Sequence, residues 1–344
     1  MGDESNGFVV LDTNIWVHTT RLLRTGLGAA LLHSVKQTKK VLGLPEVIEL
    51  EIRKHVVKSG TAAIDLIDAN YRLIEQLMGA RDDYQVPSAE AIAQRVDSRL
   101  NDLSALLHRV PFSLQHAKNA LARVMDESPP NGLKNQQFKD SAIWEAILEL
   151  SLQGPVSFVT ADRAFFKDQK TELGLAPNLV ADCDAAKVDV RIFSEVGGYL
   201  HSIKQEVPTL DKERVVAAVN TALMSQLLQM ADVGGYELGQ LTKQNIDAYL
   251  TETVDVIAVE FELSYEARGV LIPNTQIEVR GTNVVHGSCT YQLQDGSVSD
   301  LHLGFMKMFD DSGQQIPTYG SIYAYASSHS GRMTIPYTVR YPLD

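Results

Sequence analysis

Short apolar runs that end in polar side chains dominate the first half of the sequence. Residues 7–11 lead directly into Asp12-Thr13-Asn14, and residues 156–160 lead into Ala161-Asp162-Arg163. A run of this length, followed by capping side chains and then by residues at helical spacing, predicts a strand that passes directly into a helix. Similar runs occupy 41–45 and 189–193. Strands alternating with helices predict a mostly parallel sheet covered by helices on both faces.

The same reasoning gives the helices of this region. We expect helices over 15–40, from Pro45 through Lys54, after Asp162, over 140–152 and over 195–204. Between about 60 and 126 the apolar residues recur at helical spacing, with breaks at Pro87 and Pro111. This pattern predicts a largely helical insert in the α/β region.

The second half of the sequence has a different pattern of apolar, polar and turn residues. We expect a long helix over 211–230 and a short one over 242–250, and from 253 apolar and polar residues alternate, as in a β domain. Turn residues stand at 273–274, 295–296 and 311–313, and eight of the 12 tyrosines lie in 249–344. The predicted organisation is therefore an α/β domain over 1–205, a helical connector over 206–252 and a small antiparallel β domain over 253–344.

Charge and composition restrict where any nucleic-acid chemistry takes place. Residues 1–205 carry 26 acidic and 23 basic side chains, whereas residues 206–344 carry 17 and 8. Binding to a phosphate backbone needs clustered Lys and Arg, so the strongly acidic second half is a poor candidate for it. Neither a span of about 20 apolar residues nor a signal peptide is present, and we expect a cytoplasmic protein without a membrane partner. The two cysteines, Cys183 and Cys289, form no zinc motif.

Acidic residues follow the predicted strands, where loops and helix N-termini of a parallel sheet converge. Asp12 and Asp162 each end a strand, and Glu51 and Asp140 lie on or at the start of helices that would face the same edge. Four neighbouring carboxylates repel one another unless a divalent cation neutralises them, and hard oxygen ligands suit Mg²⁺ or Mn²⁺. The set predicts metal-dependent hydrolysis of a phosphodiester. Taken singly, each Asp is equally well explained as a helix N-cap, and Glu51 as a solvated helix residue.

Four segments together carry a resemblance to a known family. In their order and spacing the chain resembles the PIN-domain nucleases, in particular the larger PIN-like proteins with a C-terminal β domain. The resemblance covers roughly residues 7–205. The segments are Val9-Val10-Leu11-Asp12-Thr13-Asn14-Ile15-Trp16, Leu44-Pro45-Glu46-Val47-Ile48-Glu49-Leu50-Glu51-Ile52, Phe138-Lys139-Asp140-Ser141-Ala142-Ile143-Trp144 and Phe158-Val159-Thr160-Ala161-Asp162-Arg163-Ala164-Phe165.

The resemblance implies a three-layer α/β fold and a Mg²⁺- or Mn²⁺-dependent endonuclease that usually acts on RNA. Its acidic metal ligands would be Asp12, Glu51, Asp140 and Asp162, with Glu49 as the alternative to Glu51. Supporting and substrate-binding roles would fall to neighbouring residues: Thr13, Asn14 and Thr160 would orient the acids, and Arg53, Lys54, Lys139 and Arg163 would hold flanking phosphates.

Two other classes of protein with clustered acidic residues match this sequence less well. A phosphatase of the haloacid-dehalogenase type needs a second Asp where Asn14 stands, and a response-regulator receiver has no place for the long helical insert. The alternatives that stay open are a catalytically silent scaffold and a nuclease that acts on single-stranded DNA. The acidic C-terminal domain suggests a homo-oligomer or a regulatory protein partner, and this layout would suit a toxin–antitoxin or phage-defence effector.

Overall fold

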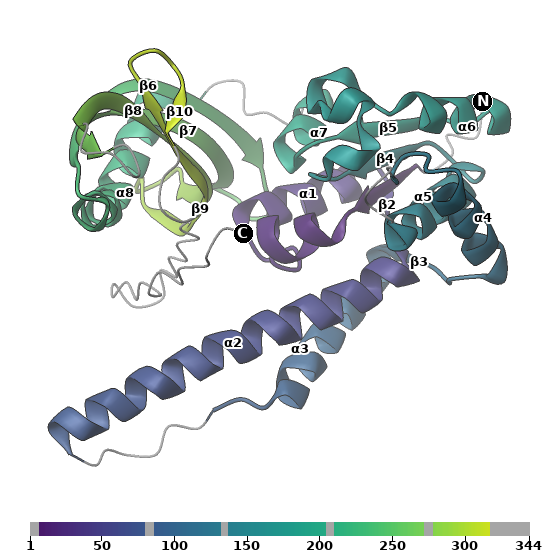
Figure 1. The fold of residues 1–344 in the computed structure, drawn as a ribbon, viewed down its shortest axis with the longest axis horizontal. Coiled ribbons are helices and arrows are strands. Elements are labelled where there is room, and N and C mark those ends of the chain that lie inside the picture. The colour runs from purple at the N-terminus through teal and green to yellow at the C-terminus, as the bar shows by residue number, and fades with distance from the viewer. Residues whose placement is uncertain (1–6, 80–85, 132–136, 204–209, 272–277, 317–344) are drawn as a thin grey trace. The chain divides into compact units, whose positions relative to one another are not determined.

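The computed structural model describes residues 7–79, 86–131, 137–203, 210–271 and 278–316. The chain divides into two compact units, which we describe separately (Figure 1). The first consists of Met1–Leu22 and Val35–Tyr199, and the second of Leu23–Ser34 and Leu200–Asp344. The second unit therefore includes a short segment taken from within the sequence of the first. Within the described residues, no helix combines the length and the apolar character needed to cross a membrane.

A parallel sheet forms the centre of the first unit, as the sequence predicted, and it has five strands, one more than expected. Its strands lie in the order β3-β2-β1-β4-β5. Because the chain runs from β1 outward to β2 and β3 and then returns to the other side of β1, the connections reverse direction between β1 and β4. The strands are β1 (Phe8–Leu11), β2 (Val41–Pro45), β3 (Leu107–Val110), β4 (Val156–Val159) and β5 (Val190–Phe193).

Helices cover this sheet. The helix α5 packs against β1, β2 and β4, and both tryptophans, Trp16 and Trp144, are fully buried. The helices of the first unit are η1 (Ile15–Thr19, one π-helical segment), α2 (Glu46–Met78), α3 (Ala89–Asp102), η2 (Ser104–Leu106), α4 (Leu114–Met125), α5 (Phe138–Ser151), α6 (Pro177–Ala186) and α7 (Val196–Ser202). Most of α1 (Gly26–Gln37) belongs to the segment that groups with the second unit. The predicted alternation of short strands and helices is confirmed.

Three local predictions in this unit were wrong. The single helix expected over 15–40 is interrupted, because Arg21, Leu22 and Leu23 all have positive φ, which no right-handed helix accommodates. Residues 107–110, expected to be helical, form the edge strand β3. After Asp162 the chain makes three short 3-10 turns, Arg163–Phe165, Lys167–Gln169 and Thr171–Leu173, and α6 begins only at Pro177.

The second unit contains one long helix and a second sheet. The helix α8 (Lys212–Gly234) packs its buried residues Val219, Leu223 and Leu227 against an antiparallel sheet in the order β10-β9-β8-β7-β6. The strands are β6 (Glu237–Leu250), β7 (Val256–Leu271), β8 (Glu278–Gln292), β9 (Val298–Asp310) and β10 (Gln315–Ile316). The predicted long helix and antiparallel β architecture are confirmed.

The short helix expected over 242–250 was wrong, because this segment belongs to β6. Ile246 and Ala248, two residues apart, are both buried and pair with Phe261 and Val259 of β7. Alternation with a period of two is the strand pattern, and pairing over a long register overrides the local helical signal. Of the predicted turns, 295–296 and 311–313 join neighbouring strands, and 273–274 lies outside the described residues.

Candidate active site

Asp12 occupies the centre of the candidate site. It follows β1 directly, beside the point between β1 and β4 where ligands of open α/β sheets commonly bind. Its side chain is almost completely buried, and both of its oxygens accept hydrogen bonds. Oδ1 accepts the backbone N–H of Thr13 at 2.7 Å, and Oδ2 accepts the hydroxyl of Thr160 at 2.7 Å. The carboxylate is therefore held in one orientation by two neighbouring strand ends.

Thr160 connects two of the predicted acids. Its fully buried hydroxyl donates to Asp12 and accepts the backbone N–H of Asp162 at 3.0 Å. Asp162 in turn accepts the N–H of Ala164 at 2.8 Å and so caps the turn that follows. The cap uses one oxygen of Asp162, so the capping role is compatible with a role in the site.

The two candidate glutamates on α2 have different surroundings. Glu51 accepts the hydroxyl of Thr13 at 2.9 Å, and its other oxygen contacts the Lys139 ammonium. Glu49 instead forms ion pairs with Arg53 at 3.0 Å and with Arg109 of β3 at 3.1 Å. Residues two apart on a helix point to nearly opposite sides. The structure thus brings Glu51 to the side of Asp12 and places Glu49 against the edge strand.

Asp140 lies in the first turn of α5 and completes the cluster. Burial, reinforced by the negative charges of Asp162, Asp12 and Glu51, raises the pKa of Asp140 to about 7, and the neighbouring Lys139 opposes this increase. Burial also raises the pKa of Asp12, although its hydrogen bonds from Thr160 and Thr13 oppose the change. The four acids are therefore electrostatically coupled, and they disfavour full ionisation of the cluster.

The cluster is more open than a closed ion-binding cage. Among the described residues, no three of these four carboxylates offer oxygen atoms within 4.8 Å of one another. The all-oxygen, all-anionic donor set nevertheless fits Mg²⁺ or Mn²⁺, ions that commonly bind to only one or two carboxylates and retain several waters. A bound ion would draw the carboxylates together, since it removes the repulsion that keeps them apart.

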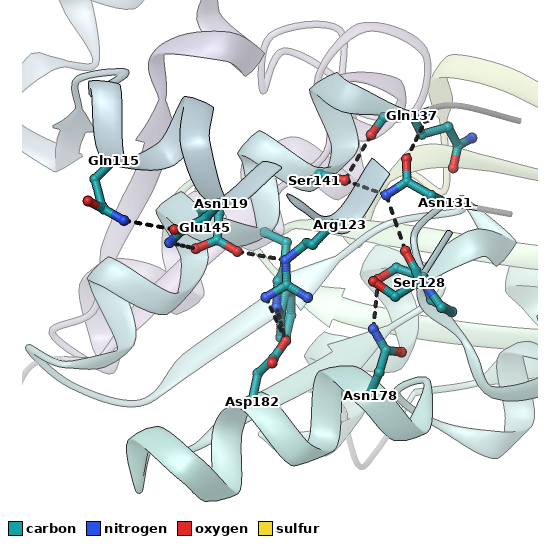
Figure 2. Close-up of polar contacts among 12 residues, drawn as sticks. Gln115, Asn119, Arg123, Ser128, Asn131, Gln137, Ser141, Glu145, Asn178 and Asp182 are labelled. Atoms are coloured by element: carbon teal, nitrogen blue, oxygen red, sulfur yellow. Dashed lines mark hydrogen bonds and ion pairs between the residues drawn. The ribbon is translucent and has the colours of Figure 1, made fainter. Parts of the chain in front are cut away.

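A polar network that the sequence analysis missed holds the start of α5 in place (Figure 2). The buried Asn131 amide donates to the Ser141 hydroxyl at 2.8 Å, and its oxygen accepts the N–H of Gln137 at 2.7 Å. Ser141 donates to the Gln137 carbonyl at 3.0 Å. Because Ser141 is adjacent to Asp140, this network fixes the position of that acid. The only signal in the sequence was the loop composition of residues 128–132, which does not indicate such a role.

The remaining predicted site residues have three kinds of surroundings. Lys139 contacts the cluster through Glu51, and Asn14, Lys54 and Arg163 have exposed side chains. Arg53 is already engaged, because it pairs with Asp97 of α3 at 2.6 Å as well as with Glu49. Arg53 thus connects α2 to α3 in the described structure and does not contact the acids of the cluster.

Comparison with known protein families decides the identity of the first unit. The family model described as PIN domain matches residues 9–165. Residues 9–165 form a PIN domain. This match includes all four clustered acids and four strands of the central sheet, in the order β3-β2-β1-β4. PIN domains are generally nucleases and typically use divalent metal ions. No curated protein and no solved structure matches the chain.

The raised pKa of Asp140 predicts an unusual pH dependence of stability in the metal-free PIN domain. The folded state holds a proton on Asp140 up to about pH 7, whereas the unfolded chain releases it near the ordinary aspartate pKa of 3.8. Stability contributed by that proton is present at low pH and is lost as the pH rises through about 7. Between about pH 5.5 and 8, wild type should lose about 2 kcal/mol more unfolding free energy than Asp140→Asn. Chemical unfolding in EDTA measures this difference, and parallel pH profiles would contradict it.

Proposed function

We propose that this protein is a metal-dependent endoribonuclease that hydrolyses phosphodiester bonds of single-stranded or structured RNA. The observation that carries the proposal is the convergence of Asp12, Glu51, Asp140 and Asp162 at the strand ends of a PIN domain. The shared hydroxyl of Thr160, which fixes Asp12 relative to Asp162, supports it further. A structural cap alone would not require four mutually repelling carboxylates at one edge of the sheet.

The residues of the site would have separate roles in metal binding, orientation and substrate binding. The four acids would hold Mg²⁺ or Mn²⁺, which supplies positive charge to the phosphate oxygens and acidifies the attacking water. Thr13 and Thr160 orient Glu51 and Asp12 through the hydrogen bonds described above. The exposed Lys54 and Arg163 would position the flanking phosphates. Lys139, which contacts Glu51, would bind a substrate phosphate beside the acids.

The acidic composition of the rest of the chain supports an enzyme whose cleavage activity is restrained. Residues 206–344 carry a net charge of −9, which disfavours direct binding of RNA by the second unit. We propose that this unit mediates homo-oligomerisation or binds a regulatory protein. An appended acidic unit of this kind would suit a toxin or phage-defence effector whose cleavage is held back until it is triggered.

The two glutamates of α2 provide a matched test of the proposal. Purified wild type, Glu51→Gln and Glu49→Gln are incubated with labelled single-stranded RNA, a structured RNA and single-stranded DNA, in Mn²⁺ or in EDTA. We expect Mn²⁺-dependent RNA cleavage by wild type, at least about a hundredfold slower cleavage by Glu51→Gln, and less than about a threefold change for Glu49→Gln. Glu49→Gln should instead destabilise the fold, because Arg109 loses its ion pair with Glu49 and Arg53 keeps only Asp97.

The possible failures are distinguishable. Cleavage of DNA in preference to RNA would show a DNA-directed nuclease at the same site. Loss of cleavage in Glu49→Gln with full activity in Glu51→Gln would reverse the assignment of the two glutamates. Neither cleavage by wild type nor a Mn²⁺-induced increase in its melting temperature would contradict the proposal and favour a catalytically silent scaffold.

A further inference from the structure

The helix α2 is much longer than the neighbour that covers it. Its 33 residues span about 50 Å, whereas the antiparallel α3 has 14 residues. Arg53 pairs with Asp97, and Gly60 lies against Ile92, which fixes the register of the two helices. By that register the first residue of α3 lies near residue 63 of α2. Among the described helices, α3 therefore covers only the first part of α2, as Figure 1 also shows.

Beyond this register, one side of α2 stays apolar. Ile64, Ile67, Tyr71, Ile74 and Met78 alternate spacings of three and four, which places them on one face of the helix. Ile67 is 43% exposed, Ile74 39% and Met78 76%. Leu66, Leu73 and Leu77 widen the stripe to about half of the helix circumference and are also exposed. We refer to these eight side chains as the α2 stripe. Six of these eight side chains are exposed, and Ile64 and Tyr71 are half-buried. An apolar surface with this many neighbouring exposed side chains indicates an interaction site.

The spacing and position of the α2 stripe indicate that its occupant is a helix. The same face of α2 is covered by the helix α3 in the first part, where Gly60 allows close approach to Ile92. Alternating spacings of three and four are the pattern by which one helix packs along another. Nucleic acid is a poor occupant, since the stripe contains no Lys or Arg.

The charged residues along the border of the α2 stripe indicate which kind of helix would bind to it. Asp68 and Glu75, seven residues apart, both border it next to the row formed by Ile64, Tyr71 and Met78. In an antiparallel pair of two identical copies these acids would face their own counterparts and repel. In a parallel pair they would face Ala63 and Asn70, which offer no positive charge. A second copy of the chain therefore fits less well than a partner with basic side chains in the facing positions.

We propose that the α2 stripe is a docking surface for an amphipathic helix of another protein, whose apolar stripe is bordered by Lys or Arg. This partner-binding role is separate from the proposed cleavage and does not depend on it. Burial of the stripe would supply the affinity, and Asp68 and Glu75 would supply discrimination between basic and acidic helices.

A pair of synthetic peptides tests the proposal on the full-length protein. Both peptides have four heptads with Leu at the apolar positions, and the bordering positions carry Lys in one and Glu in the other. Binding of each labelled peptide is measured by fluorescence anisotropy. We expect wild type to bind the Lys peptide at least about tenfold more tightly than the Glu peptide. Asp68→Lys/Glu75→Lys should invert this preference.

A second variant distinguishes docking from general attraction to an acidic protein. Ile67→Glu/Ile74→Glu increases the negative charge while disrupting the α2 stripe, so general attraction would strengthen binding of the Lys peptide. Our proposal instead requires loss of binding, with circular dichroism and melting temperature close to wild type because both side chains are exposed. Three results would overturn it: binding of neither peptide by wild type, equal binding of both, or a wild-type dimer that this variant dissociates. The last would identify a second copy of the chain as the occupant.

Discussion

Replacement of Asp12 by asparagine is expected to reduce Mn²⁺-dependent RNA cleavage by about a thousandfold, equivalent to about 4 kcal/mol of transition-state stabilisation. Asparagine retains the shape of the side chain and an oxygen that can accept the Thr13 N–H, but it removes the charge at the centre of the acidic cluster. The measurement is the cleavage rate of labelled single-stranded RNA at saturating Mn²⁺, under conditions in which wild type shows a clear rate.

The stability of the same variant provides the control. Because burial raises the pKa of Asp12, its ionised form is disfavoured in the folded protein, and asparagine removes this cost. Metal-free Asp12→Asn should therefore melt at or above the temperature of wild type, while Mn²⁺ should stabilise it much less. An inactive variant that is also unfolded would point to a structural cap, and a folded variant with wild-type cleavage would remove Asp12 from the active site.

Replacement of Arg123 by methionine is expected to reduce the unfolding free energy of the first unit by about 3–5 kcal/mol. Arg123 of α4 forms ion pairs with Glu145 of α5 and Asp182 of α6, both at 2.7 Å (Figure 2). The exposed fraction of the side chain is 15% for Arg123 and 7% for Glu145. Removing the arginine leaves the buried Glu145 carboxylate and the half-buried Asp182 carboxylate without their positive partner, so the cost exceeds that of the lost contacts alone.

An exposed arginine on the same unit provides a matched control for this prediction. Arg191 pairs with Asp189 at 3.3 Å, with exposed side-chain fractions of 72% and 53%, and Arg191→Met should change the unfolding free energy by less than about 1 kcal/mol. Urea unfolding followed by tryptophan fluorescence measures both variants, since both tryptophans, Trp16 and Trp144, lie in the first unit. Equal effects of the two substitutions would show that the pairs around Arg123 contribute no more than a surface ion pair.

The sequence alone was sufficient to predict a strand where the signal for it lies in the residues of the strand itself. Residues 8–11, 41–45, 156–159 and 190–193 are short, mostly apolar runs next to polar residues, and all four form parallel strands. By contrast, β3 contains His108 and Arg109, and its strand conformation depends on pairing with β2. Helical spacing on its two sides outweighed so weak a strand signal, because edge strands are determined by tertiary pairing rather than by composition.

In the candidate site, too, some features could be predicted from local signals and others depend on tertiary contacts. Asp12 and Asp162 follow predicted strands, so their approach at one edge of the sheet followed from topology. The choice between Glu49 and Glu51 required the rotation of α2 about its axis, which the sequence leaves open because both glutamates lie in the same turn. The support of Asp140 by Asn131 required a contact between a loop and a helix ten residues apart. Contacts of this kind have no periodicity from which they could be predicted.

The composition of the second unit has a consequence for the order in which the chain folds during synthesis. Leu23–Ser34 groups with the unit formed by Leu200–Asp344, although the ribosome makes it long before that part exists. Its side chains Leu27, Ala30 and Leu31 are almost completely buried in the finished protein. Gly26 lies directly against Cys289 and Thr290 of β8, so this contact can form only after the C-terminal half has been synthesised. A chain that stops after the PIN domain would keep the segment without its partner, so the two units are not independent products of a single cut.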